Sequence, residues 1–359
     1  MNFSNNNIIP NIPAPIVGEI EVLAFRQDNN PVDAVKALLK GEYVLVEDVY
    51  STGLAILAKL KSYLRLKYSE ENFQAQRELR AAYHEASRRL IVVVQNQRLA
   101  LRKAPEIGFL GRFYPNQANF LLSFPEVQGL NSAWQWYEKG ISMPGLNHKL
   151  HPFFGTYFPT RFDHLQLFDG WMKKYVGAKK QAVDVGVGSG ILSFMMLKHG
   201  FETVVGTDSN PNAIIGARED AQRMGVSGKL GLIHGDLLAD FQGKADLIVF
   251  NPPWLPAQGS ISGLDRAIYY DDTLFPRFFE QAYRCLEPEG KLVILFSNLA
   301  VTAGVANTNP VEVELLSGGR FTKVQQLTRN VKEASVKTKR NQTWRAAEQV
   351  ELWELKKSE

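Results

Sequence analysis

The chain has 359 residues, a formal net charge of +4 and a single cysteine, Cys285. This length can hold two domains with substantial cores, and the charge is too mild to prove a nucleic-acid partner. One cysteine excludes an internal disulfide framework, and we expect Cys285 to be a small buried residue. No apolar run is long enough to span a bilayer and no basic-then-apolar signal opens the chain, so we expect a cytoplasmic protein without a membrane partner.

Residues 1–147 are expected to form an accessory domain that is helical first and α+β later. It opens with an Asn-rich and Pro-rich stretch that suggests an extended arm. Helical spacing and then strand-like runs follow, at residues 32–40, 50–68, 71–90, 90–95 and 119–124. Such a domain either selects the substrate or covers the catalytic domain, and the sequence leaves these two roles open.

A glycine-rich turn joins a strand to a helix in the middle of the chain. An apolar run up to Val185 precedes Gly186, Gly188 and Gly190, and a helical pattern follows. Glycines allow a ligand to approach the backbone, but dinucleotide-binding folds use such a turn as well. Asp184 distinguishes this turn, because a carboxylate here would repel a pyrophosphate. We therefore expect a ligand that is cationic or carries hydroxyl groups.

Acids also follow the next two strands. Residues 203–207 form a strand-like run that leads into Asp208 and Ser209, and residues 229–234 form another before Asp236. Asp208 is placed to accept hydrogen bonds from both hydroxyls of a ribose, and Asp236 is placed to accept one from an adenine amino group. Each acid alone is explained equally well as a helix cap or a loop residue. Three acids at three successive strand ends favour a ligand site.

The tetrapeptide Asn251-Pro252-Pro253-Trp254 follows a fourth strand, at residues 246–250. Open α/β sheets bind ligands at the carboxyl ends of their strands. The prolines leave backbone carbonyls free to face a ligand, Asn251 supplies a side-chain oxygen, and Trp254 supplies a flat apolar wall. This set suits the binding of a planar amino group by its hydrogens, with its plane against an aromatic ring. A stiff turn that ends the strand is the alternative.

Together these motifs resemble the class I S-adenosylmethionine-dependent methyltransferases, in particular the small-domain N-methyltransferase branch with Asn-Pro-Pro-aromatic. The resemblance covers roughly residues 150–355. It implies a Rossmann-like, doubly wound α/β domain over residues 148–359, with a mostly parallel seven-stranded sheet and an antiparallel C-terminal strand pair. It also implies S-adenosylmethionine as the cofactor, and we expect no metal.

The resemblance assigns cofactor contacts to the strand-end residues. Asp184 and the three glycines of the turn would line the methionine end of the cofactor. Asp208 would bind its ribose with Ser209 beside it, and Asp236 would bind its adenine. Asn251 would border both the cofactor and the substrate.

For the substrate, the resemblance implies that Asn251 and the Pro252 carbonyl hold the target amino group while Trp254 stacks on its plane. Hydrogen bonds from both amino protons would push electron density onto the nitrogen and orient its lone pair toward the sulfonium methyl. In-line displacement then depends on positioning more than on a base, so no general base is assigned. We expect three further residues at the substrate: Pro253, Tyr269 and Tyr270.

The segment Gly155–His164 resembles the aromatic-Pro-x-x-acid segment that precedes the sheet in the glutamine-amide methyltransferases of release factors. It differs from their pattern because Thr160-Arg161 stands where Arg-Pro is expected. Small-domain ribosomal RNA methyltransferases share the tetrapeptide but usually carry Phe or Tyr at the position of Trp254.

Basic residues between Lys59 and Arg112, and again between Arg329 and Arg345, favour RNA as the substrate class, although solvated basic loops explain them equally well. The leading hypothesis is methylation of a planar nitrogen in an RNA base of the ribosomal type. A protein glutamine amide, a small metabolite and a non-catalytic cofactor-binding scaffold are the alternatives. His148 and His151 are interpreted as ordinary polar residues because no third metal ligand is near in sequence. The oligomeric state stays open.

Overall fold

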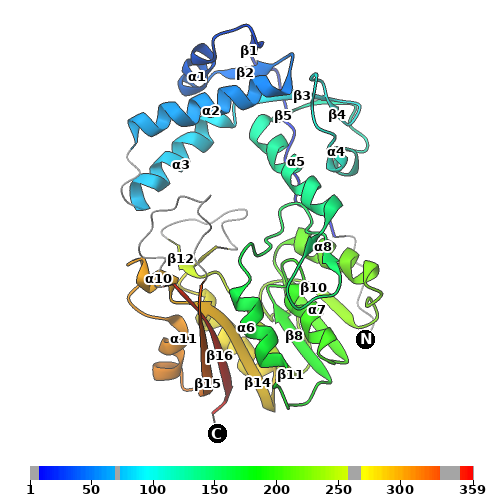
Figure 1. Ribbon diagram of the computed structural model, residues 1–359, viewed down its shortest axis with the longest axis vertical. Helices are drawn as coiled ribbons and strands as arrows, with labels where there is room; N and C mark the ends of the chain where they lie inside the picture. Colours follow the sequence, from blue (N-terminus) through cyan, green and yellow to red (C-terminus); the bar gives the residue numbers. More distant parts are fainter. Residues whose placement is uncertain (1–7, 69–72, 258–267, 332–347, 359) are drawn as a thin grey trace. The chain divides into compact units, whose positions relative to one another are not determined.

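A seven-stranded sheet forms the centre of the larger of two compact units, which contains residues 8–11 and 136–358. The computed structural model describes residues 8–68, 73–257, 268–331 and 348–358. In sheet order the strands are β10 (Leu230–His234), β9 (Thr203–Asp208), β8 (Gln181–Val185), β11 (Ala245–Phe250), β14 (Leu286–Ser297), β16 (Gln349–Lys357) and β15 (Phe321–Asn330) (Figure 1). The first five strands are parallel to one another, whereas β16 is antiparallel to both β14 and β15. The predicted mostly parallel sheet with its antiparallel C-terminal pair is therefore confirmed.

Continuous apolar runs form the central strands because both faces of the sheet are covered. Along β11, Ile248 and Phe250 belong to one hydrophobic cluster, whereas Leu247 and Val249 belong to another. The first cluster contains buried residues of helix α9 (Leu274–Cys285), including Cys285. The second contains residues of α6 (Asp163–Met172) and α7 (Ile191–Lys198), and Figure 1 shows α6 in front of the sheet. The sheet is thus wound on both faces.

The chain reverses its direction of travel across the sheet between β8 and β11. The units β8–α7–β9 and β9–α8–β10, with α8 at Pro211–Arg223, proceed toward one edge, and β11 then returns to the other side of β8. Such a switch point leaves a crevice outside the carboxyl ends of the two central strands. In folds of this type, a ligand site is expected where Val185 and Phe250 end their strands.

Shorter elements complete this unit. Between its main strands and helices lie β6 (Ile141–Ser142), β7 (Lys149–Leu150), β12 (Leu255–Pro256), β13 (Tyr269–Tyr270), α10 (Leu299–Thr302), α11 (Pro310–Val313) and the π-helix η2 (Glu314–Gly318). Within the described part of the chain, no helix is both long and apolar enough to cross a membrane.

The smaller unit, Ile12–Gln135, has its own five-stranded sheet. Its elements in chain order are β1 (Val22–Phe25), α1 (Pro31–Lys40), β2 (Tyr43–Val46), α2 (Tyr50–Lys67), α3 (Phe73–Ser87), β3 (Leu90–Gln95), β4 (Arg98–Leu99), α4 (Gly108–Phe113), β5 (Asn119–Ser123) and α5 (Phe124–Lys139). Strands β1, β2 and β3 are parallel, and β3 also pairs antiparallel with β4 and β5. Strands β1 and β2, which alternate with the first helices, were not predicted from the sequence. The predicted domain boundary is at residue 147, whereas residues 136–147 group with the larger unit.

Candidate active site at the switch point

Four strand ends meet along one edge of the larger sheet. The register pairs Val185 of β8 with Phe250 of β11 and with Thr207 of β9, and pairs Asp208 with His234 of β10. The residues that follow these strands therefore lie along the same edge. This edge brings together the glycine turn, the acids after β9 and β10, and the tetrapeptide.

The glycine turn has the geometry that only glycine adopts readily. Gly186, Gly188 and Gly190 have φ values of +70°, +50° and +80°, in the left-handed region. A Cβ atom on Gly190 would lie 2.7 Å from the ring of Phe194, so this position also lacks room for a side chain. Gly190 is the N-cap residue of α7, and the N–H of Ser193 in the first turn of this helix donates to Asp184 Oδ2.

Asp184 is fully buried beneath this turn. Its Oδ2 accepts hydrogen bonds from the backbone N–H of Ser193, at 2.9 Å, and from the Ser193 hydroxyl, at 2.6 Å. Burial raises the pKa of the carboxyl to about 8, although the Ser193 hydrogen bonds act in the opposite direction. The carboxyl therefore fastens the strand end to the first turn of α7. Its expected place at the methionine end of the cofactor stays a prediction.

Three buried side-chain polar atoms lack a hydrogen-bond partner among the described residues: Thr156 Oγ1, Asp184 Oδ1 and Thr207 Oγ1. All three belong to segments that border the glycine turn. The carbonyl of Gly155 accepts a hydrogen bond from Asn210 Nδ2 at 2.8 Å, and the carbonyl of Tyr157 would lie 3.5 Å from a Cβ on Gly188. Buried polar atoms without partners are uncommon in folded proteins and indicate a bound ligand or water. The donors and acceptors here fit a polar ligand.

Asp208 lies at the edge of the turn with both carboxylate oxygens engaged by the backbone. Oδ1 accepts from the N–H of Asn210 at 2.8 Å, and Oδ2 accepts from the N–H of Gly188 at 2.9 Å. Burial raises the pKa of this carboxyl, and the hydrogen bonds lower it. Each oxygen keeps a second lone pair that can accept a ligand hydroxyl. Ser209, next in the chain, is exposed beside it.

Asp236, expected at the adenine, forms an ion pair with Arg277 of α9. Its side chain is 55% exposed, so the pair contributes little to stability and can open at small cost. Leu237 has φ +51°, an uncommon conformation for a branched side chain that recurs at functional sites. The sequence analysis did not identify Arg277, because nothing in its local sequence marks it as the partner of an acid on another loop.

The tetrapeptide begins directly beyond Phe250. Pro252 is buried, and Asn251, Pro253 and Trp254 are partly buried. The indole N–H of Trp254 donates a hydrogen bond to Asn251 Oδ1 at 3.3 Å. The two-stranded ladder of β12 and β13 starts at the next residue and fixes where the tetrapeptide ends. Asn251 and Trp254 therefore contact each other at the switch point.

The two tyrosines predicted at the substrate have different environments. Tyr270 is 9% exposed, and its ring lies 5.1 Å from that of Phe275 and 6.5 Å from that of Phe296, between centroids. Its ring therefore belongs to the hydrophobic core, and its expected contact with the substrate stays a prediction. Tyr269 is partly buried and stays a candidate. Adjacent residues of a strand point to opposite sides, which explains why the two differ.

Other predicted features lie away from this edge or outside the described residues. The basic segment is described only up to Val331, and its Arg329 Nε lies 3.7 Å from Asp163 Oδ1. His151 Nδ1 lies 2.6 Å from the Tyr137 carbonyl oxygen. Across residues 8–68, 73–257, 268–331 and 348–358, no group of three or more His, Cys, Asp or Glu side chains is placed to hold a metal ion.

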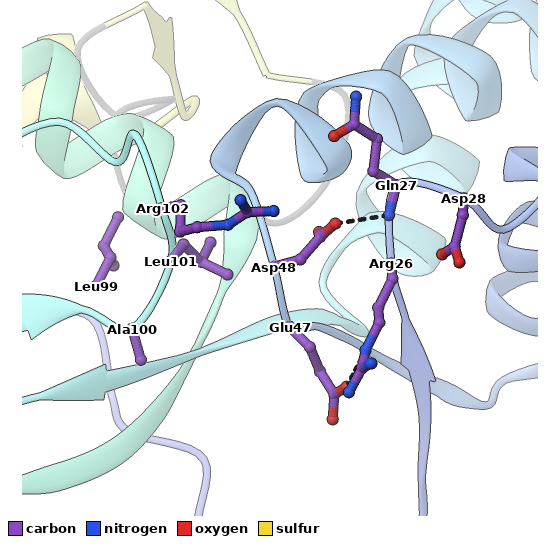
Figure 2. Close-up of a pocket in the computed structure, with 9 residues that line it drawn as sticks. All are labelled: Arg26, Gln27, Asp28, Glu47, Asp48, Leu99, Ala100, Leu101 and Arg102. Atoms are coloured by element: carbon purple, nitrogen blue, oxygen red, sulfur yellow. Dashed lines mark hydrogen bonds and ion pairs between the residues drawn. The ribbon is translucent and has the colours of Figure 1, made fainter.

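A separate open pocket lies in the smaller unit, where β1 and β2 end (Figure 2). Three of its charged side chains, Arg26, Glu47 and Asp48, have local partners. Asp48 accepts hydrogen bonds from the backbone N–H of Gln27 at 2.8 Å and from the Thr52 hydroxyl at 2.9 Å, and Arg26 pairs with Glu47 at 3.0 Å. Through these hydrogen bonds Asp48 joins the end of β1 to the start of α2.

Comparisons with known proteins match the part of the chain that contains the glycine turn and the tetrapeptide. Residues 166–306 match the family model of the methyltransferase small domain. A putative protein N5-glutamine methyltransferase of Methanocaldococcus jannaschii is 37% identical over 117 residues, which are 32% of this chain and 55% of the relative. A ribosomal RNA small subunit methyltransferase C of Alcanivorax borkumensis is 33% identical over 139 residues, which are 37% of this chain and 39% of the relative.

A ribosomal protein L11 methyltransferase of Pelotomaculum thermopropionicum is 40% identical over 80 residues, which are 22% of this chain and 26% of the relative. The chain thus spans about half, or less, of the length of these relatives. The cofactor expected for such a domain is S-adenosylmethionine. Through residues 166–306, the chain is similar to the methyltransferase small domain, and the relatives that it matches are named as methyltransferases.

Proposed function

We propose that this protein is an S-adenosylmethionine-dependent N-methyltransferase that acts on a planar amino or amide nitrogen. The observation that carries the proposal is the edge where β8 and β11 end, with a left-handed glycine turn beside Asn251 and Trp254. The unpartnered polar atoms around that turn support a ligand with several polar groups. The match to the methyltransferase small domain supports the reaction class.

In this proposal the glycine turn and the two acids at the neighbouring strand ends hold the cofactor. The turn allows close approach to the backbone, Asp208 accepts hydrogen bonds from the ribose hydroxyls, and Asp236 accepts one from the adenine amino group. Asp184 acts beneath the turn, because its contacts run to Ser193 of α7. When bound, S-adenosylmethionine supplies an electrophilic methyl group on a sulfonium.

The tetrapeptide would hold the nucleophile. Asn251 Oδ1 and the Pro252 carbonyl accept hydrogen bonds from the two N–H groups of the target amino group, which returns electron density to its nitrogen. The Trp254 ring holds the plane of the group, so that the lone pair points along the line of attack. Positioning of this kind supplies roughly 7–11 kcal/mol of barrier reduction, more than a general base usually adds. The released proton passes to solvent, and no base is assigned.

An RNA base is the first-choice substrate. Helix α2 of the smaller unit contains no acidic residue and exposes Lys59, Lys61 and Lys67, and such cations favour phosphate contacts. The similarity to a ribosomal RNA methyltransferase points the same way. The similarity to a putative N5-glutamine methyltransferase favours the second candidate, a glutamine amide in a protein.

The test is transfer of labelled methyl from S-adenosylmethionine into RNA, protein and small-molecule fractions of cells that lack this protein. We expect label in the RNA fraction with the wild type and with Asn131→Ala, an asparagine of the smaller unit, but not with Asn251→Ala. The transfer should weaken steeply with salt, because phosphate contacts release counterions. Label in protein alone would select the glutamine alternative. Cofactor binding without label in any fraction would favour a non-catalytic scaffold.

A further inference from the structure

A histidine that the sequence analysis did not single out packs against the tetrapeptide. His164, in the first turn of α6, is 4% exposed. Its ring is perpendicular to that of Trp254, with an interplanar angle of 89° and centroids 5.6 Å apart. The indole in turn donates its N–H to Asn251 Oδ1 at 3.3 Å. His164, Trp254 and Asn251 therefore form a continuous series of contacts.

The orientation of the Asn251 amide matters for the proposed reaction. The two ends of an asparagine amide have nearly the same shape, so packing alone does not decide which end faces a ligand. If the amide were turned over, its two N–H donors would face the donors of the target amino group. The N–H of Trp254 can pair only with the oxygen end, and it thereby favours the orientation in which that oxygen stays near the substrate position.

His164 lies on an element that is fastened at its start. Asp163 Oδ1 lies 3.7 Å from Arg329 Nε of β15, and Arg161 Nη1 lies 3.2 Å from Glu348 Oε2, directly before β16. Burial lowers the pKa of His164 to about 4, and the nearby Asp163 charge opposes this only in part. The imidazole is therefore neutral near pH 7 and packs against the indole as an uncharged ring.

We propose that His164 and Trp254 are a positioning pair, in which His164 fixes the plane of the indole and the indole N–H fixes the amide of Asn251. This inference rests on the proposed N-methyltransferase function. It assigns the Trp254 indole a second task beside stacking, which phenylalanine at this position cannot perform. His164 acts through Trp254 and needs no contact with the substrate.

The kinetic test uses methyl transfer into ribosomes and total RNA from cells lacking the protein. Trp254→Phe should lower kcat roughly three- to tenfold, the value of one neutral hydrogen bond, with KM changed less than about twofold. Replacement of Trp254 by 3-benzothienylalanine, which keeps the bicyclic ring and lacks the N–H, should give the same loss. His164→Ala should also lower kcat. Trp171→Phe, which removes an indole hydrogen bond to Glu354 at 2.8 Å, is the matched control and should leave kcat unchanged.

Wild-type kcat in the benzothienyl variant, or an equal loss in Trp171→Phe, would overturn the positioning pair. The indole N–H signal of Trp254 in a ¹⁵N–¹H spectrum provides a readout that does not depend on activity. Asn251→Ala should shift this signal and speed its exchange with solvent, and His164→Ala should broaden or shift it. If the wild type transfers no methyl group but the signal shifts as predicted, the proposed function is refuted and the contacts are supported. Unchanged signals would refute the contacts themselves.

Discussion

Replacement of Asp184 by asparagine should change how the stability of the larger unit depends on pH. Burial raises the pKa of this carboxyl to about 8 in the folded protein, whereas an aspartate in an unfolded chain titrates near pH 3.9. Between these values the folded state holds a proton that the unfolded state has lost, so stability falls as pH rises. One pKa unit corresponds to about 1.36 kcal/mol, so the titration of this carboxyl should lower the free energy of unfolding by about 4 kcal/mol between pH 5 and pH 8.

The assay is the free energy of opening at several pH values, from hydrogen exchange of β8 amides, which report on the larger unit. Asp184→Asn cannot titrate, and its side-chain oxygen can still accept the hydrogen bonds from Ser193. The difference in the free energy of opening between the variant and the wild type should therefore shift by about 4 kcal/mol in favour of the variant from pH 5 to pH 8. Above pH 8 this difference should change little. A difference that stays constant within about 1 kcal/mol would refute the assignment of a raised pKa to buried Asp184.

Two further predictions concern the turn and the adenine end. Gly190→Ala should destabilise the larger unit by about 2 kcal/mol or more, through the left-handed backbone and the close Phe194 ring. Gly225 has a similar φ, +69°, and open space around it, so Gly225→Ala should lower the free energy of unfolding by only about 1 kcal/mol in thermal melts. Equal losses of stability in the two variants would exclude a steric contribution from Phe194. Asp236→Ala should weaken S-adenosylmethionine binding by about tenfold in calorimetry, whereas Arg277→Gln should change Kd less than threefold. If both variants weaken S-adenosylmethionine binding equally, the ion pair between Asp236 and Arg277 is itself required for binding.

The sheet and its ligand edge were predictable because local sequence carries them. Parallel strands buried on both faces appear as short apolar runs, and the residues after each run mark its carboxyl end. The three glycines of the turn were visible in the sequence, and their positive φ values are a finding of the structure. Strands β1 and β2 were missed because each has four residues, and most of β1 is exposed.

Contacts between distant segments were not predictable from one sequence. His164 meets Trp254 only because α6 and the end of β11 converge in the fold, and neither segment carries a motif for that pairing. Tyr269 and Tyr270 are adjacent and identical, so the sequence cannot indicate which ring enters the core. The contact of Asp184 with Ser193 was not predictable either, because it depends on the angle at which α7 leaves the turn.

The most direct test of the central claim separates turnover from cofactor binding at Asn251. S-adenosylmethionine affinity by calorimetry and methyl transfer into RNA and protein fractions would be measured for the wild type and for Asn251→Ala. Loss of most turnover, with Kd changed less than about threefold, is the predicted result, because Asn251 acts on the nucleophile. Equal loss of binding and turnover, or full turnover without Asn251, would contradict the account.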